Sequence, residues 1–202
     1  MIKTVIFDLG RVIVPFQHEI AYARVEAAGG AKAADIPGLL AATDLPERIE
    51  TGTIAAHDFA ERIFDLLNFR VSYEEFCDIW TSIFLPDTLV SDELVAAIAR
   101  NHRLVLLSNT SAVHFDMIHD TYPILRHFDQ FILSHEVGAM KPNPAIYAAA
   151  IAAARCEPHQ CFFTDDIPAY VEGARQAGID AVQFLNESQL RKELAARGIA
   201  CD

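Results

Sequence analysis

Six polar side chains in this sequence have the types and positions needed for chemistry on a charged ligand. They are Asp8, Ser108, Asn109, Lys141, Asp165 and Asp166. All but Lys141 stand at the ends of short apolar runs, and Lys141 lies in the segment GAMKPNPAIY. If the runs are parallel strands, their carboxyl ends meet at one edge of a sheet, where ligands bind in such folds. We therefore expect the six side chains to share one cleft.

Three carboxylates in one cleft would repel one another and hold protons at neutral pH unless a cation lay among them. Mg²⁺ typically takes one or two protein carboxylates and leaves a position for a phosphate oxygen, which suits Asp8 with one of the paired aspartates. Lys141 would neutralise Asp8 or bind a phosphate oxygen, and Ser108 with nearby amides would bind another. Asp8 is then placed to attack phosphorus, giving an aspartyl phosphate that water hydrolyses.

The elements that must position these groups are visible as apolar runs. Each run is hydrophobic throughout, as a parallel strand covered on both faces requires. The runs span residues 4–8, 103–108, 130–134, 161–165 and 181–185. Segments with helical spacing precede three of them, namely DELVAAIARN, PAIYAAAIAAAR and YVEGARQAG. The alternation predicts an α/β fold with a doubly wound parallel sheet.

Residues 16–88 interrupt this alternation because they contain helical patterns and no strand-like run. The helical patterns are HEIAYARVEAAGG, IPGLLAAT, AAHDFAERIFDLLN and SYEEFCDIWTSIF. In the last of these, Ser72 is expected to cap a helix with acidic residues in its first turn. We predict a small all-helical domain at 16–88, inserted after the first strand of a core domain formed by 1–15 and 89–202.

Composition excludes several classes of partner. The net charge is −12 and the 16 Lys and Arg residues are scattered, so neither a nucleic acid nor an anionic membrane is an expected partner. No apolar run approaches the length of a membrane span, and the N-terminus has no signal-peptide pattern, which together predict a cytoplasmic protein. The four cysteines lack metal-binding spacing and are expected to be reduced thiols. The oligomeric state stays open.

Four segments in order, FDLGRVIV, LLSNTS, GAMKPNPAIY and FFTDDIPAYVEGARQAG, resemble the four motifs of the haloacid dehalogenase-like hydrolase superfamily. The helical insert is similar to the small C1-type cap of that superfamily, over a Rossmann-like core. Within it, the chain most resembles phosphatases related to bacterial α-D-glucose-1-phosphate phosphatase and to the N-terminal domain of soluble epoxide hydrolase. The resemblance implies a Mg²⁺-dependent phosphatase acting on a small phosphorylated metabolite, with a sugar phosphate expected.

The resemblance also assigns a role to each matching position. The nucleophile falls on Asp8, the phosphate-binding hydroxyl on Ser108, and the lysine of the third motif on Lys141. Asn109 is expected to touch the substrate. The metal ligands fall on Asp8, on the backbone carbonyl of Gly10, on Asp166 directly and on Asp165 nearby or through water.

Two positions depart from the family pattern. Many phosphatases of the superfamily have a second aspartate two residues after the nucleophile, which serves as general acid and base, and here that residue is Gly10. The glucose-1-phosphate phosphatase group resembles this chain in having glycine there. Tyr170 stands where relatives tend to have asparagine. Among neighbouring residues, Arg11 could add positive charge near a phosphate, and Phe16 is a candidate for touching the substrate.

Two other functions are compatible with the sequence. The first is a metal-independent 2-haloacid dehalogenase, in which Asp8 displaces halide from carbon; Gly10 permits this, but the Asp165-Asp166 pair suits a metal better. The second is a catalytically weak protein that keeps the phosphate site and works by binding phosphate esters. The missing second aspartate and Tyr170 leave that hypothesis open.

Overall fold

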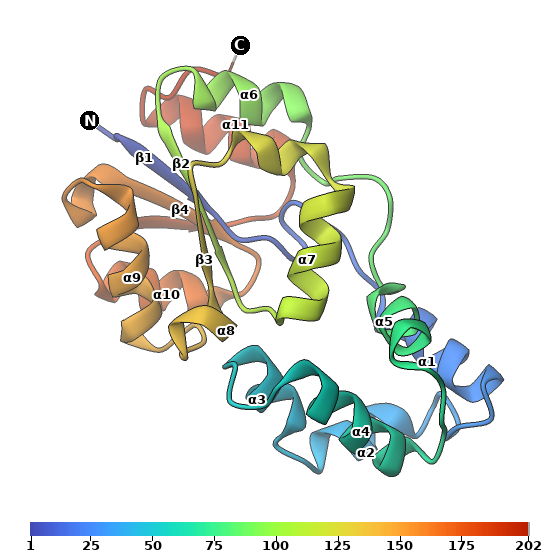
Figure 1. The fold of residues 1–202 in the computed structure, drawn as a ribbon. Helices are drawn as coiled ribbons and strands as arrows, with labels where there is room; N and C mark the ends of the chain where they lie inside the picture. The colour runs from blue at the N-terminus through green and yellow to red at the C-terminus, as the bar shows by residue number, and fades with distance from the viewer. Residues whose placement is uncertain (202) are drawn as a thin grey trace.

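Five parallel strands form one sheet at the centre of the larger domain. The computed structural model describes residues 1–201, and Figure 1 shows the sheet with helices around it. The strands are β1 (Thr4–Phe7), β2 (Arg103–Ser108), β3 (Gln130–Leu133), β4 (Cys161–Asp165) and β5 (Asp180–Gln183). Their order is β3-β2-β1-β4-β5, so the winding direction reverses at β1. The predicted doubly wound α/β fold is confirmed, and Asp8 follows the strand at which ligands bind in such sheets.

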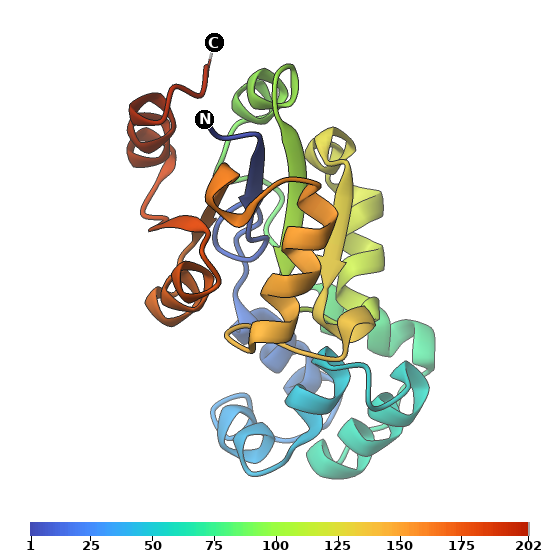
Figure 2. The ribbon, with the colours of Figure 1, turned by 90° about the vertical axis from the view of Figure 1, so that its left-hand side faces the viewer.

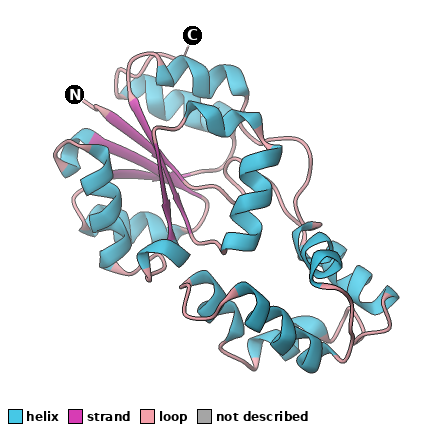
Figure 3. Cartoon of the chain, in the orientation of Figure 1, coloured by secondary structure: helices cyan, strands magenta, loops and turns pink. Residues whose placement is uncertain are grey.

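Helices cover both faces of the sheet. The helices in this part of the chain are α6 (Asp92–Ala99), α7 (Ala112–Thr121), α8 (Ser134–Val137), α9 (Pro144–Ala154), α10 (Pro168–Gln176) and α11 (Glu187–Ala196), with 3₁₀ turns η1 (Pro123–His127) and η2 (Pro158–Gln160). Apolar residues of α6, α7 and α11 pack on one face, and those of α9 and α10 pack on the other. Figure 3 shows the two helical layers with the strands between them.

Burial on both faces explains why the strand sequences do not alternate. Val5 and Phe7 of β1 face the first layer, Ile6 faces the second, and all three are fully buried. The predicted strand 181–185 runs too far, because β5 ends at Gln183 and Leu185 is 65% exposed. The predicted 4–8 and 130–134 each extend one residue beyond the strand that forms.

Residues 16–88, called the cap segment below, form helices joined by loops, together with an isolated β-bridge between Phe16 and Phe84. The helices are α1 (His18–Ala27), α2 (Ile36–Ala41), α3 (Leu45–Glu50), α4 (Ala56–Leu67) and α5 (Tyr73–Thr81). They enclose an apolar cluster of their own, which includes Phe59, Ile63 and Phe76. Ser72 accepts a hydrogen bond from the backbone N–H of Glu75, so the predicted cap of α5 is confirmed. The domain boundaries at 15/16 and 88/89 stay a prediction.

The cap segment lies against the carboxyl ends of the strands, as Figure 2 shows. Its two connections to the sheet run side by side, because Gln17 N–H donates to Ile83 O at 2.8 Å and Leu85 N–H donates to Pro15 O at 2.9 Å. Helix α3 contacts α8. The backbone of Gly52 packs so closely on His135 that a Cβ there would overlap the carbonyl oxygen of His135.

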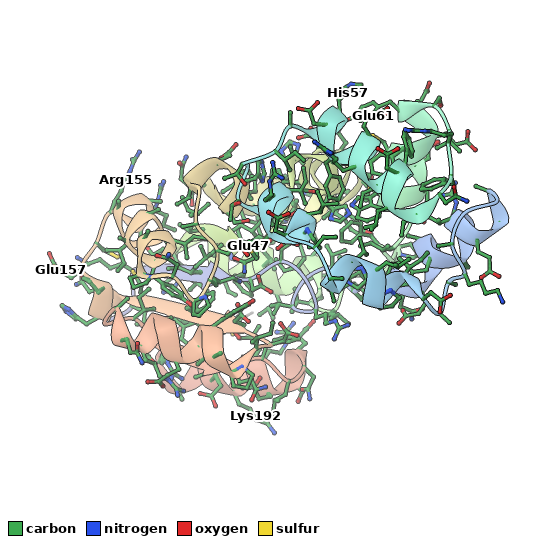
Figure 4. The ribbon with its side chains drawn as sticks, turned by 90° about the horizontal axis from the view of Figure 1, so that it is seen from below. Glu47, His57, Glu61, Arg155, Glu157 and Lys192 are labelled. Carbon is green, nitrogen blue, oxygen red and sulfur yellow. The ribbon has the colours of Figure 1, made fainter. Side chains whose placement is uncertain are left out.

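The outer surface is strongly charged. Figure 4 shows Glu61, Arg155, Glu157 and Lys192 pointing away from the molecule, and all four are exposed. Across residues 1–201, the helices are too short or too polar for any to traverse a lipid bilayer.

Candidate active site

Strand register brings the polar strand ends together. Phe7 pairs with Leu106 of β2 on one side and with Thr164 of β4 on the other. Asp8 is the next residue, and its N–H still donates to Thr164 O at 3.0 Å. Asp8 is therefore level with Asp165, which ends β4, and close to Ser108, which ends β2.

Lys141 links two of the carboxylates. Its Nζ lies 2.6 Å from Oδ1 of Asp8 and 2.6 Å from Oδ2 of Asp165, and it also donates to Leu107 O at 3.1 Å. The Lys141 side chain is 1% exposed, that of Asp165 0% and that of Asp8 9%. One ammonium group thus faces two buried carboxylates, and negative charge remains in excess at this point.

The titration of these groups reflects that excess. Burial raises the pKa of Asp8 to about 7, and Asp165 adds to the increase, although Lys141 opposes it. Burial alone would lower the pKa of Lys141, but Asp8 and Asp165 outweigh it and hold the pKa above its ordinary value. The pKa of Asp166 is also raised, by burial and then by Asp165. The ammonium group therefore stays charged, and the carboxylates favour a further cation.

Three carboxylates have the arrangement of a cation site. One oxygen from each of Asp8, Asp165 and Asp166 lies within 4.8 Å of the other two. An all-oxygen donor set is the kind that Mg²⁺ prefers. Both oxygens of Asp165 already accept hydrogen bonds, one from Lys141 Nζ and one from Ile167 N–H at 2.8 Å. Asp8 and Asp166 are therefore the better placed of the three to bind an ion directly.

Asn109 holds the backbone of Lys141. Its Oδ1 accepts from Lys141 N–H at 2.7 Å, and its Nδ2 donates to Lys141 O at 3.1 Å. The same Nδ2 lies 3.4 Å from the hydroxyl of Tyr170, whose ring is 5.2 Å from Lys141 Nζ. Tyr170, which departs from the family pattern, therefore belongs to the cluster. A contact of Asn109 with substrate stays a prediction.

A cavity of about 110 Å³ lies beside this cluster, next to Leu9 and Gly10, which follow Asp8 in the chain. Gly10, Ser108 and Asn109 line it from the sheet, and Phe16 and Glu50 line it from the cap segment. Ser108 is itself buried, at 2% exposure. The structure thus brings the six predicted side chains and Gly10 to one edge of the sheet. Phe16, the expected substrate contact, lies in the wall of this cavity.

A second cavity of about 350 Å³ continues into the cap segment. His18, Glu50, Ile83 and His114 line both cavities, so the two share a boundary. Its wall is mostly apolar and aromatic, with Tyr22, Phe59 and Trp80 among its residues. The site therefore has a small part next to Ser108 and Asn109 and a larger part within the cap segment.

Arg11 adds positive charge beside the carboxylates. Its backbone adopts a left-handed conformation, with φ of 58°, and its guanidinium lies 4.9 Å from the centre of the Phe16 ring. Its charge opposes the rise in the pKa of Asp166. This agrees with the candidate role of Arg11 near an anionic ligand.

Three site residues escaped the sequence interpretation. His18 and His114 lie only a few residues after the first and second motifs, whereas Glu50 lies far from any motif. His18 and Glu50 belong to the cap segment, where side-chain directions do not follow from spacing. The sequence holds one signal near Glu50, namely the glycine two residues later. In the structure this residue, Gly52, has φ of +68° and packs closely on His135 of the core.

Comparison with known proteins decides the family. A family model described as haloacid dehalogenase-like hydrolase matches residues 2–178. This chain belongs to the haloacid dehalogenase-like hydrolases. The resemblance of the four motifs to this family is thereby confirmed.

Two relatives of this hydrolase match almost end to end. D-ribitol-5-phosphate phosphatase of Bacteroides thetaiotaomicron is 26% identical over 200 residues, covering 96% of this chain and 97% of the relative. A predicted HAD-like hydrolase from Porphyromonas gingivalis, of known structure, is 26% identical with a TM-score of 0.78, covering 98% and 97% of the two chains.

A third comparison concerns the fold. The HAD family enzyme bt-2542 of Bacteroides thetaiotaomicron, solved in complex with magnesium and inorganic phosphate, has a TM-score of 0.83 at 23% identity. It covers 92% of this chain and 96% of its own. The two chains therefore share the same overall fold over most of their length.

Proposed function

We propose that this hydrolase is a Mg²⁺-dependent phosphatase that acts on a small phosphorylated metabolite, a sugar or polyol phosphate, through an aspartyl phosphate on Asp8. The observation that carries the proposal is the buried Asp8–Lys141–Asp165 cluster beside a small cavity that Gly10, Ser108 and Asn109 line. A phosphatase for D-ribitol 5-phosphate is a relative over nearly the whole chain, and the fold is that of an enzyme solved with magnesium and phosphate.

Each protein group has a role in this reaction. Asp8 is the nucleophile, and Ser108 and Lys141 bind phosphate oxygens, so that phosphorus is held in line with the attacking carboxylate. Asp165 accepts a second hydrogen bond from the Lys141 ammonium and so helps to hold it in place. Asn109 fixes the backbone of the same lysine.

The carboxylates fit a magnesium ion. Asp8 and Asp166 would bind it, with the carbonyl of Gly10 as a third protein ligand and Asp165 nearby, since the oxygens of the three aspartates lie within 4.8 Å of one another. When bound, the ion supplies positive charge that screens the phosphate from the carboxylates. In the absence of such a cation, burial holds the pKa of Asp8 at about 7, so a large share of this nucleophile would be protonated at neutral pH.

Each of the two cavities binds a different part of the substrate. The smaller cavity, where Ser108 and Asn109 supply polar groups, suits a phosphate group, and the larger one suits the organic part. The cap segment then closes over the bound ester and excludes water from the first step. We place the hinges at 14–18 and 85–90, where the two connections run side by side.

The test is a hydrolysis screen of sugar, polyol and aryl phosphates, with Mg²⁺ and with EDTA. We expect turnover of at least one sugar or polyol phosphate in Mg²⁺, a loss of activity in EDTA, and no turnover by Asp8→Asn. Hydrolysis that persists in Asp8→Asn would overturn the mechanism. Halide release from a 2-haloacid without metal, with no phosphate ester hydrolysed, would favour the dehalogenase hypothesis instead.

A further inference from the structure

The site has an unfilled catalytic requirement. An alkoxide is a poor leaving group, so the oxygen of a sugar or polyol phosphate needs a proton as its bond to phosphorus breaks. Position 10 has no side chain to give one. The ammonium of Lys141 is held by Asp8, Asp165 and Leu107 O and has a pKa above its ordinary value, so it is a poor donor.

Three titratable side chains, His18, Glu50 and His114, line both cavities. In the proposed binding mode they lie where the phosphate group joins the organic part of the substrate. His114 is an unsuitable acid. Its Nε2 lies 3.3 Å from the carbonyl oxygen of Trp80, which can only accept, so Nε2 carries the hydrogen of the neutral ring. Burial lowers the pKa of His114 to about 4, which leaves its Nδ1 without a proton at neutral pH.

His18 is unsuitable for a similar reason. Burial lowers its pKa below the ordinary histidine value, and the positive charge of Arg11 lowers it further, although Glu19 opposes the change. His18 is therefore mainly neutral at pH 7, and a neutral imidazole is a very weak acid. Of the three groups, only a carboxyl remains.

Glu50 is held in position by the backbone around it. It ends α3, next to the buried Ile49, and the chain two residues later packs on the core through Gly52 and His135. Within the described range 1–201, the Glu50 carboxyl has no hydrogen bond or ion pair, yet it is mostly buried and feels the charge of Lys141. A carboxyl that is fixed, buried and unpartnered at the boundary of two cavities is suited to exchange protons with a ligand.

The surroundings of Glu50 set its titration. Burial raises its pKa to about 7, and Lys141 opposes the increase. Tyr170 faces it from α10, since the charge of Glu50 raises the pKa of that phenol. Of the helices that pack on α3, α4 and α8 carry titratable groups. These groups are His57, Asp58, Glu61, Arg62, Asp65, His135 and Glu136. None of these is among the causes of the shift, so burial and Lys141 govern it.

We propose that Glu50 is the general acid and base of this hydrolase, supplied by the cap segment in place of the carboxylate that is absent at Gly10. This inference rests on the proposed phosphatase function. In the first step, Asp8 attacks phosphorus, the bond from phosphorus to the ester oxygen breaks, and that oxygen takes the proton of Glu50 to leave as an alcohol. In the second step, the Glu50 carboxylate takes a proton from water as its oxygen bonds to phosphorus and the Asp8–phosphorus bond breaks.

The test compares esters with good and poor leaving groups. A p-nitrophenolate leaves without a proton, whereas an alkoxide does not. Glu50→Gln should therefore release p-nitrophenol in the first turnover at close to the wild-type rate, followed by slow turnover. The same variant should lose about 100- to 10,000-fold in the first turnover of a sugar or polyol phosphate. The rate of alcohol release should fall above pH about 7 in wild type and be independent of pH there in Glu50→Gln.

Two variants complete the experiment. Glu47→Gln changes an exposed carboxyl on the same helix and should behave as wild type, and Glu50→Asp should recover part of the lost rate. The inference is overturned if Glu50→Gln and Glu50→Asp lose the aryl and alkyl esters in equal proportion, or if Glu50→Gln keeps wild-type rates and pH dependence on alkyl esters. If wild type hydrolyses neither class of ester, the proposed function itself has failed.

Discussion

A Cβ atom on Gly10 would lie 2.9 Å from Cε1 of Phe16, closer than such atoms approach in proteins. Position 10, where many phosphatases of the superfamily have a second aspartate, is therefore packed against an aromatic ring in this chain. The guanidinium of Arg11 lies 4.9 Å from the centre of the same ring. A side chain at position 10 would thus disturb a packed contact. Under the proposed phosphatase mechanism, the proton donor comes from elsewhere in the cavity.

The contact between Gly10 and Phe16 predicts a coupling in stability. Gly10→Ala should lower the free energy of unfolding by about 1–3 kcal/mol, because the added methyl overpacks the site. In a Phe16→Leu background the same substitution should be better tolerated, with a coupling of at least about 0.5 kcal/mol. Urea unfolding of the two single variants and the double variant measures this cycle. Strictly additive effects would show that the ring does not limit position 10.

Lys141 should be essential for stability as well as activity. Lys141→Met leaves the carboxylates of Asp8 and Asp165 buried without their shared cation, which should lower the free energy of unfolding by about 3–5 kcal/mol in EDTA. Magnesium should restore part of this loss, since an ion that binds only the folded state stabilises it. Lys192→Met, at an exposed position, is the control and should change little. If Lys141→Met were as stable as the control, the role of Lys141 as the cation that neutralises Asp8 and Asp165 would be contradicted.

The sequence alone was sufficient to predict the sheet and the polar side chains at one edge of it. Uniformly apolar runs predict buried parallel strands, and the fold then forces their ends, Asp8, Ser108 and Asp165, to one side. That inference needs only the period of the pattern and the direction of the strands. Lys141 follows from its place between two runs together with the resemblance to the family.

The cap side of the site was not predictable in the same way. The six-residue helix α3, which ends at Glu50, is too short to show a helical period, and its direction depends on its packing against α8. The contact of Phe16 with Gly10 joins residues whose backbone geometry no local pattern specifies. Residues of the cap segment reach the site through tertiary packing, whereas those of the sheet reach it through strand register.

Asn109 and Tyr170 should differ in importance. Asn109→Ala removes both hydrogen bonds to the backbone of Lys141, at 2.7 and 3.1 Å, and should lower kcat/KM on the order of 100-fold by displacing the ammonium group. Tyr170→Phe removes only a 3.4 Å contact and should change kcat/KM by less than about tenfold. Steady-state kinetics on one substrate compares the two variants. A larger effect for Tyr170→Phe would mean that the phenol, not the amide, organises the site.

Gly52 should control the closed position of the cap segment. A side chain there would overlap the carbonyl of His135, and φ of +68° disfavours any residue with a Cβ. Gly52→Ala should therefore move α3, and Glu50 with it, away from the core and lower kcat/KM for alkyl phosphates. Gly38→Ala, in open space on α2, is the matched control and should keep wild-type kinetics. If Gly52→Ala also keeps them, this contact does not position the site.

His114 should make the folded state sensitive to acid. Burial lowers its pKa to about 4 from an ordinary value of 6.5, so between these pH values the unfolded chain binds more protons than the native protein. The contribution is present above pH 6.5 and is lost as the pH falls through about 4, by an amount on the order of 3 kcal/mol. Its ring lies between Trp80 of α5 and Phe84, so protonation should also loosen the cap segment from α7. Urea unfolding from pH 4 to 7 should show a shallower pH dependence in His114→Gln than in wild type. Parallel curves for the two proteins would assign the acid sensitivity to other groups.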